Sequence, residues 1–187
     1  MANDPRGFTG EVVHAEVSVQ GLKYFRDGLY CSEAMFRAFN EVFGLGIPVE
    51  YYRFLTGFGS GLGESGCVCG AVTGCVMALS AIAGRAETYE SEHDLYRSVH
   101  ELHEEFKRHH RALCCRVLSA GFKWKSREHR IHCENYILTA GDLTDRLFNG
   151  SLRDYLPPAP GIVKKPPMKK TPLALIRRIA SAVERES

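Results

Sequence analysis

A run rich in glycine and cysteine separates two helical parts of the chain. Residues 57 to 75 read GFGSGLGESGCVCGAVTGC and hold seven glycines and three cysteines in nineteen positions. Glycine is unfavourable inside helices and strands, but it permits positive φ and close backbone approach. The run therefore predicts a tightly turning loop that follows one helix and opens another. Three thiols in such a loop can ligate a metal or exchange electrons.

The same run also contains Gly61, Gly63 and Gly66 at the GxGxxG spacing of dinucleotide-binding loops. That motif has a physical role only where a strand delivers the chain to the glycine turn. The segment before these glycines has helical periodicity, and no Gly-Lys-Ser/Thr sequence completes a P-loop. The sequence therefore favours a redox role over phosphate binding, with a flexible surface loop as the plain alternative.

Apolar residues recur at helical spacing along most of the chain, and no run shows the sustained alternation of a half-buried strand. The sequence thus predicts an all-α fold, a compact helical bundle with a glycine-rich loop. The expected helices cover residues 11–26, 31–44, 48–57, 69–84, 91–110, 111–121 and 127–148.

Local signals place the ends of several of these helices. Pro48 suits the first position of one helix and Ser91 suits the N-cap of another, while Gly44 and Gly121 supply stops. The helix over 69–84 is expected to be central, because its small side chains allow another helix to approach closely. These small residues are Ala71, Gly74, Cys75, Ala78 and Ala81.

A change of composition near residue 156 predicts three parts. Residues 1–155 form the helical, cysteine-rich redox domain. Residues 156–171 form a linker rich in proline and lysine, which suits an extended conformation. Residues 172–187 form a short amphipathic helix, which needs a partner surface because a helix of this length is marginal alone. Self-association through this helix, giving a homodimer, is the simplest expectation.

Charge and hydropathy exclude several classes of protein. The net charge is +2, from 24 basic and 22 acidic residues, so no global field favours nucleic acid. The longest apolar stretch, residues 71–83, falls short of the ~20 residues of a membrane span. The N-terminus lacks a secretory signal pattern, so we expect a cytoplasmic protein.

Seven cysteines form an odd set for a disulfide framework, and thiols in a reducing compartment serve more often as ligands or catalysts. Cys31 and Cys133 lie on apolar helical faces. His132 precedes Cys133 and is expected either to support it as a neighbouring polar group or to serve as an alternate ligand. The histidines His100, His103, His109 and His110 are interpreted as solvated residues that flank apolar stripes.

The stretches LYCSEAMFRAF, GFGSGLGESGCVCGAVTG, CRVLSAG and HCENYI together resemble a bacterial and archaeal family of redox proteins. The family is named for its C-GCAxxG-C-C pattern, and the resemblance covers about residues 22 to 140. A related module in split-Soret cytochrome c is similar to an iron–sulfur domain. The four family cysteines correspond to Cys31, Cys69, Cys115 and Cys133.

The resemblance implies an electron-transfer protein whose four cysteines, brought together from separate helices, bind an iron–sulfur cluster. A [2Fe–2S] centre is favoured over [4Fe–4S], through the split-Soret likeness, and the redox partner is unknown. Glycines of the loop would wrap the cofactor, and their amides can donate to its sulfurs. These glycines are Gly59, Gly61, Gly63, Gly66 and Gly70.

The chain departs from the family pattern, because the core element reads CGAVTG where the family name gives GCAxxG, and three further thiols are present. One alternative is a thiol–disulfide oxidoreductase that uses Cys67 with Cys69, or Cys69 with Cys75. Another is a zinc-stabilised or merely structural cysteine-rich interaction protein. Cys67, Cys75 and Cys114 are interpreted as residues outside the ligand set.

Overall fold

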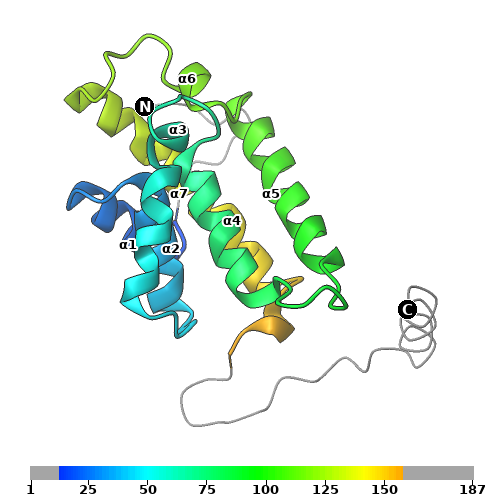
Figure 1. The fold of residues 1–187 in the computed structure, drawn as a ribbon. Coiled ribbons are helices and arrows are strands. Elements are labelled where there is room, and N and C mark those ends of the chain that lie inside the picture. The colour runs from blue at the N-terminus through cyan, green and yellow to red at the C-terminus, as the bar shows by residue number, and fades with distance from the viewer. Residues whose placement is uncertain (1–12, 158–187) are drawn as a thin grey trace, which may run out of the picture.

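Helices make up almost all regular structure in the computed structural model, which describes residues 13–157 (Figure 1). Within that range there is no strand, and one isolated bridge joins Val68 to Cys114. The all-α prediction is confirmed. The elements are α1 (Glu16–Arg26), α2 (Cys31–Val42), the 3₁₀ helix η1 (Val49–Phe58), α3 (Gly59–Leu62), α4 (Gly70–Ala83), α5 (His93–His110), α6 (Cys115–Leu118), α7 (Arg127–Asn149) and the 3₁₀ helix η2 (Arg153–Tyr155).

Helix α4 is central, as its small residues predict: it packs against α2, α5 and α7 (Figure 1). Its closest approach is to α2, where a Cβ on Gly74 would lie 2.5 Å from the carbonyl oxygen of Ser32. Only glycine permits that crossing. The buried ridge ends at Ala78, because Ala81 in the last turn is exposed.

The core continues from α4 into the packing of α1, α2 and α7. Phe39 of α2 and Phe148 of α7 are fully buried, with ring centroids 4.8 Å apart. Gly21 of α1 lies against Met35 of α2, whose Sδ would be 2.7 Å from an added Cβ. Close packing along α2 and α7 therefore helps to fix the two helices that carry Cys31 and Cys133.

Several helix ends differ from the sequence prediction. The first helix begins at Glu16, Pro48 precedes a 3₁₀ rather than an α-helix, and α5 begins two residues after Ser91. The largest difference concerns residues 111–121, where only Cys115–Leu118 is helical. The preceding residues use their backbone groups to pair with another segment, as Leu113 does when its carbonyl accepts from Cys69 N–H at 2.8 Å.

The tail predictions fall almost wholly outside the described residues. The linker over 156–171, the helix over 172–187 and the homodimer that it would support therefore stay predictions, as does the domain boundary at 155. Among residues 13–157, no helix is both long and apolar enough to span a bilayer.

The histidine interpretation is correct for His100, His103 and His109, which are exposed, and wrong for His110. The His110 ring packs against Phe106 and Tyr136, with centroids 4.6 and 4.8 Å away. Its Nε2 is buried and has no hydrogen-bond partner within the described chain. Burial lowers the pKa of His110 to about 4, from an ordinary 6.5.

This buried ring predicts an acid sensitivity of the fold. Below pH 6.5 the unfolded chain takes up a proton that folded His110 resists, so stability present above pH 6.5 is lost toward pH 4. We expect His110→Phe to recover about 1–2 kcal/mol of the stability lost between pH 7 and pH 5, a range that allows for the ring's partial exposure. Urea unfolding at both pH values measures this. His103→Gln, a change at an exposed histidine, should keep the wild-type dependence of the unfolding free energy on pH. If all three proteins show the same pH dependence, His110 is not the cause of the acid sensitivity.

Candidate functional site: a cavity lined by four cysteines

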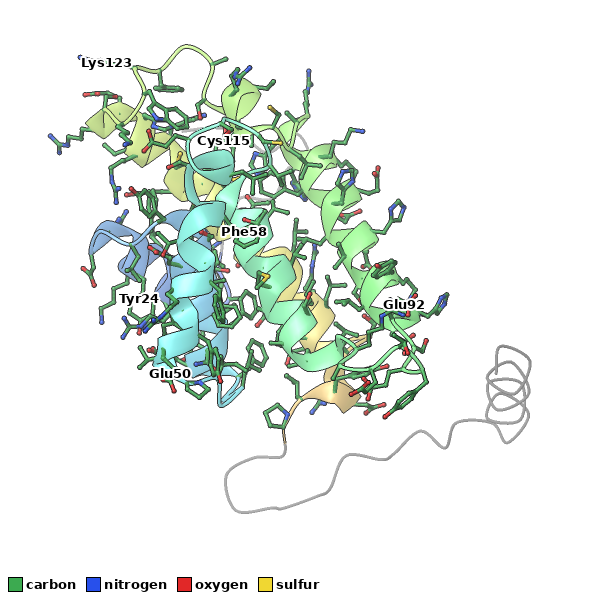
Figure 2. The ribbon with its side chains drawn as sticks, in the orientation of Figure 1. Tyr24, Glu50, Phe58, Glu92, Cys115 and Lys123 are labelled. Atoms are coloured by element: carbon green, nitrogen blue, oxygen red, sulfur yellow. The ribbon has the colours of Figure 1, made fainter. Side chains whose placement is uncertain are left out.

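One cavity of about 350 Å³ collects side chains from α1, α2, α4, α6, α7 and the loop before α7. Its lining includes all four family cysteines, which are Cys31, Cys69, Cys115 and Cys133. Figure 2 labels Cys115 at this end of the molecule, opposite Glu50 and Glu92. A volume of this size falls in the range of small-molecule pockets.

Three of the four cysteines stand where a helix begins. Cys31 is the first residue of α2, Cys69 immediately precedes α4, and Cys115 is the first residue of α6. Cys133 comes from within the long helix α7. The first N–H groups of a helix lack partners within the helix and carry partial positive charge. The starts of α2 and α4 can therefore stabilise negative charge on sulfur.

Two glycines of the loop pack directly against these cysteines. A Cβ on Gly70 would lie 2.2 Å from Cys31 Sγ, so the absence of a side chain there makes room for the sulfur. Gly61 has a φ of +71°, and its Cβ would lie 2.7 Å from Cys115 Cβ. Of the three GxGxxG glycines, Gly61 thus makes room for a cysteine in this fold.

None of the five glycines assigned to cofactor binding is itself among the cavity-lining residues. Gly59 packs against Tyr30, which lines the cavity, and Gly66 packs against Arg116. Gly63 has a φ of +57° with open space around it, so it serves the turn. Gly59, Gly61 and Gly70 therefore pack against lining residues, whereas Gly63 and Gly66 do not.

A short backbone pairing explains why Cys115, and not its neighbour, reaches the cavity. Cys69 N–H donates to the Leu113 carbonyl, and Cys115 N–H donates to the Cys67 carbonyl, on either side of the bridge between Val68 and Cys114. Side chains alternate along such extended segments. The Cys114 thiol donates instead to the Gly66 carbonyl at 2.9 Å.

The other two cysteines also lie outside the cavity lining. Cys67 is exposed. Cys75 is fully buried between helices, where its thiol donates to the Ala140 carbonyl at 3.6 Å and burial raises its pKa to about 12. The structure therefore groups the seven thiols as the sequence interpretation does, into four cavity residues and three others.

Burial raises the pKa of every cavity thiol. For Cys31, backbone hydrogen bonds, that from Ser60 foremost, offset part of this rise. The pKa of Cys69 lies well above its usual range because of burial and the neighbouring charge of Cys31. Burial and the same neighbour raise the pKa of Cys133 to about 12, and burial also raises that of Cys115. The four groups are therefore neutral thiols at neutral pH unless a cation offsets their charge.

The sequence predicts that His132 supports Cys133, but in the structure it is His129 that contacts the Cys133 sulfur. His129 Nε2 lies 3.6 Å from Cys133 Sγ and 2.9 Å from Ser119 Oγ. His132 instead contacts the Tyr136 hydroxyl and the Leu118 carbonyl, and it is not a lining residue. The missed signal is the i, i+4 spacing of His129 and Cys133 on one helix.

The hydrogen-bond direction around His129 is fixed by the backbone. Lys125 N–H donates to His129 Nδ1 at 3.1 Å, so the proton of the neutral ring sits on Nε2. Burial lowers the pKa of His129, which favours that neutral form. The Nε2–H can then donate to Ser119 Oγ or Cys133 Sγ, and the Ser119 hydroxyl, 3.9 Å from Cys115 Sγ, can donate to that sulfur.

No group of three or more His, Cys, Asp or Glu side chains that could hold a metal ion occurs within residues 13–157. The four thiols line a common cavity, and they do not meet at one ion-sized point. This arrangement by itself supports neither a single structural zinc ion nor an assembled cluster site.

Comparison with known proteins identifies the family. Residues 29–147 match the model of the family described as "Putative redox-active protein (C_GCAxxG_C_C)". That range covers more than half of the chain, and the chain belongs to this family. No curated protein and no solved structure matches it.

The contact between Gly70 and Cys31 predicts a sharp effect of one added methyl group. Gly70→Ala should displace the Cys31 sulfur or separate α2 from α4, costing about 1–3 kcal/mol as an overpacked site. Thermal unfolding and the rate of Cys31 alkylation, read by mass spectrometry, measure the two consequences. Gly57→Ala is the matched control, since nothing lies within 4 Å of its Cβ position. Equal behaviour of the two variants would refute the packing role of Gly70.

Proposed function

We propose that the cavity cysteines bind an iron–sulfur cluster and that the protein transfers electrons in the cytoplasm. The observation that carries this proposal is the convergence of Cys31, Cys69, Cys115 and Cys133 on one cavity from four separate elements. The family is redox-active by its description, and four thiolates are the usual ligand set of [2Fe–2S] and [4Fe–4S] centres. A [2Fe–2S] centre is our first expectation.

The chemistry of the donor set supports a bound cation. Four crowded thiols with raised pKa values are poor nucleophiles, whereas a metal centre deprotonates the thiols that coordinate it. The cluster would supply one-electron reduction and oxidation. The protein would supply four sulfur ligands, helix N-termini that offset negative charge, and hydrogen bonds to sulfur from Ser119 and His129.

A thiol–disulfide oxidoreductase remains the competing function, and the structure changes which thiols it would use. The pairs suggested by the sequence each include Cys67 or Cys75, and neither residue lines the cavity. A metal-free mechanism would draw its pair from the four cavity thiols. Their raised pKa values disfavour attack by a thiolate at neutral pH.

The first test is anaerobic purification of the full chain, followed by iron, sulfide and zinc analysis and by visible and EPR spectroscopy. We expect a coloured protein with two iron and two sulfide ions per chain for a [2Fe–2S] centre, or about four of each for [4Fe–4S]. A colourless protein free of metal after cluster reconstitution would overturn the proposal in favour of thiol chemistry.

Single Cys→Ser variants separate ligands from neighbours. Cys31→Ser, Cys69→Ser, Cys115→Ser and Cys133→Ser should each lose most of the iron, because a missing thiolate leaves an open iron site. Cys67→Ser, Cys75→Ser and Cys114→Ser should retain it and serve as matched controls. Full iron in the Cys31 and Cys133 variants, with loss in the Cys67 or Cys75 variants, would show that the ligand assignment is wrong.

The donors near Cys115 and Cys133 predict a change in reduction potential. Hydrogen bonds to a ligand sulfur favour the more negatively charged, reduced state, so Ser119→Ala and His129→Gln should lower the potential. A bond worth about 1 kcal/mol corresponds to roughly 40 mV for one electron. Redox titration followed by EPR measures the change. Ser98→Ala, a buried serine remote from the cavity lining, should leave the potential unaltered.

A further inference from the structure

Charge is unevenly distributed along α5 and the segment that follows it. Residues 107–130 contain eight Lys and Arg residues and one acidic residue, Glu128. Residues 87–105 contain seven Asp and Glu residues and one basic residue, Arg97. The net charge of the whole chain is only +2, so opposite local charges are separated along the molecule.

The basic segment lies at the cavity end of the molecule. Figure 2 labels Lys123 and Cys115 at one end and Glu50 and Glu92 at the other. Within the basic segment, Lys125 and Arg130 line the cavity itself. A molecule that approaches the four cysteines from solvent therefore meets the positively charged end of the protein.

Several of these cations are not neutralised by the described chain. Arg111, Lys123 and Arg127 are exposed and form no ion pair with any residue of 13–157. Lys125 is the exception at the cavity, because it pairs with Glu64. Arg108 pairs with Glu105 within α5. We call the set Arg111, Arg116, Lys123, Arg127 and Arg130 the basic rim.

Apolar side chains are exposed within the same segment. Val117 of α6 is 60% exposed, and Phe122 in the loop after it is 39% exposed. Both follow Cys115 closely in sequence. Exposed apolar side chains close in sequence to charged ones are compatible with a small, transient protein interface.

We propose that the basic rim is the docking surface for an acidic redox protein that exchanges electrons at the cavity. This proposal rests on the proposed function and specifies its partner. Charge steers an acidic partner toward the basic rim and repels it from the acidic segment 87–105, so it arrives at the cavity end of the molecule. Val117 and Phe122 then provide the desolvated contact.

A small acidic protein fits this charge pattern better than an extended polyanion or a membrane. The basic rim occupies one end of the molecule, and α5 leads from it into the acidic segment 87–105. A nucleic acid or an anionic bilayer extends beyond the rim, toward charges that repel it. A partner of limited size avoids that repulsion.

The test is binding of the full chain to an acidic flavodoxin, used as a probe, by isothermal titration calorimetry. Kd should increase about tenfold between 20 and 200 mM NaCl, because salt screens exposed charges. The double variant Lys123→Glu with Arg127→Glu should weaken binding about tenfold at low salt. The matched control is the double variant Arg85→Glu with Arg97→Glu, which makes the same change in net charge in or beside the acidic segment 87–105. It should change Kd by about twofold or less.

Absence of flavodoxin binding at low salt, or equal weakening in both double variants, would overturn the proposal. So would tighter, rim-dependent binding to heparin or to phosphatidylglycerol vesicles, since either result would assign the surface to a polyanion. The binding measurement needs no cluster and is therefore independent of the iron analysis. Binding without iron would support the docking surface and contradict the cluster. Iron without binding would support the cluster and contradict the docking surface.

Discussion

The packing of Cys31 against Gly70 is the contact on which the rest of the site depends. The sulfur occupies the space that a side chain at Gly70 would fill, and one turn further along α4, Gly74 meets the backbone of Ser32. These two contacts set how closely α2 and α4 approach. Because Cys31 begins α2 and Cys69 immediately precedes α4, the same approach brings two cysteines to one cavity. A side chain at either glycine would separate them.

The electrostatic environment of the cavity determines whether its four thiols are ionised. Burial raises the pKa of all four cavity thiols, so the folded protein holds them as neutral groups that resist ionisation. Removing their protons requires a compensating positive charge inside the cavity or directed hydrogen bonds. The chain provides some of each: helix N-termini at α2 and α4, and donors fixed in direction from Lys125 N–H through His129 to Ser119. The iron–sulfur cluster that we propose would complete the compensation.

The separation of charge on the surface complements this arrangement. Four thiolates with the proposed cluster would carry net negative charge, whereas the basic rim is positive. The rim would therefore attract the proposed acidic partner despite the negative charge of the cluster. Arg130 connects the two regions: it lines the cavity, donates to the Phe25 carbonyl at 2.5 Å and stacks on the Phe25 ring. Arg130 of the rim and Cys133 of the cavity thus lie on the same helix, α7.

The sequence by itself determined the helical class, the central place of α4 and the family, because apolar periodicity and the cysteine pattern are local in the chain. Tertiary structure decided the rest. The extended pairing of residues 67–69 with 113–115 replaced most of an expected helix and turned Cys115, rather than Cys114, toward the cavity. Likewise, His129 rather than His132 supports Cys133, and His110 is half-buried although its neighbours are exposed. Each outcome depends on contacts between segments distant in sequence, and periodicity along one segment carries no information about them.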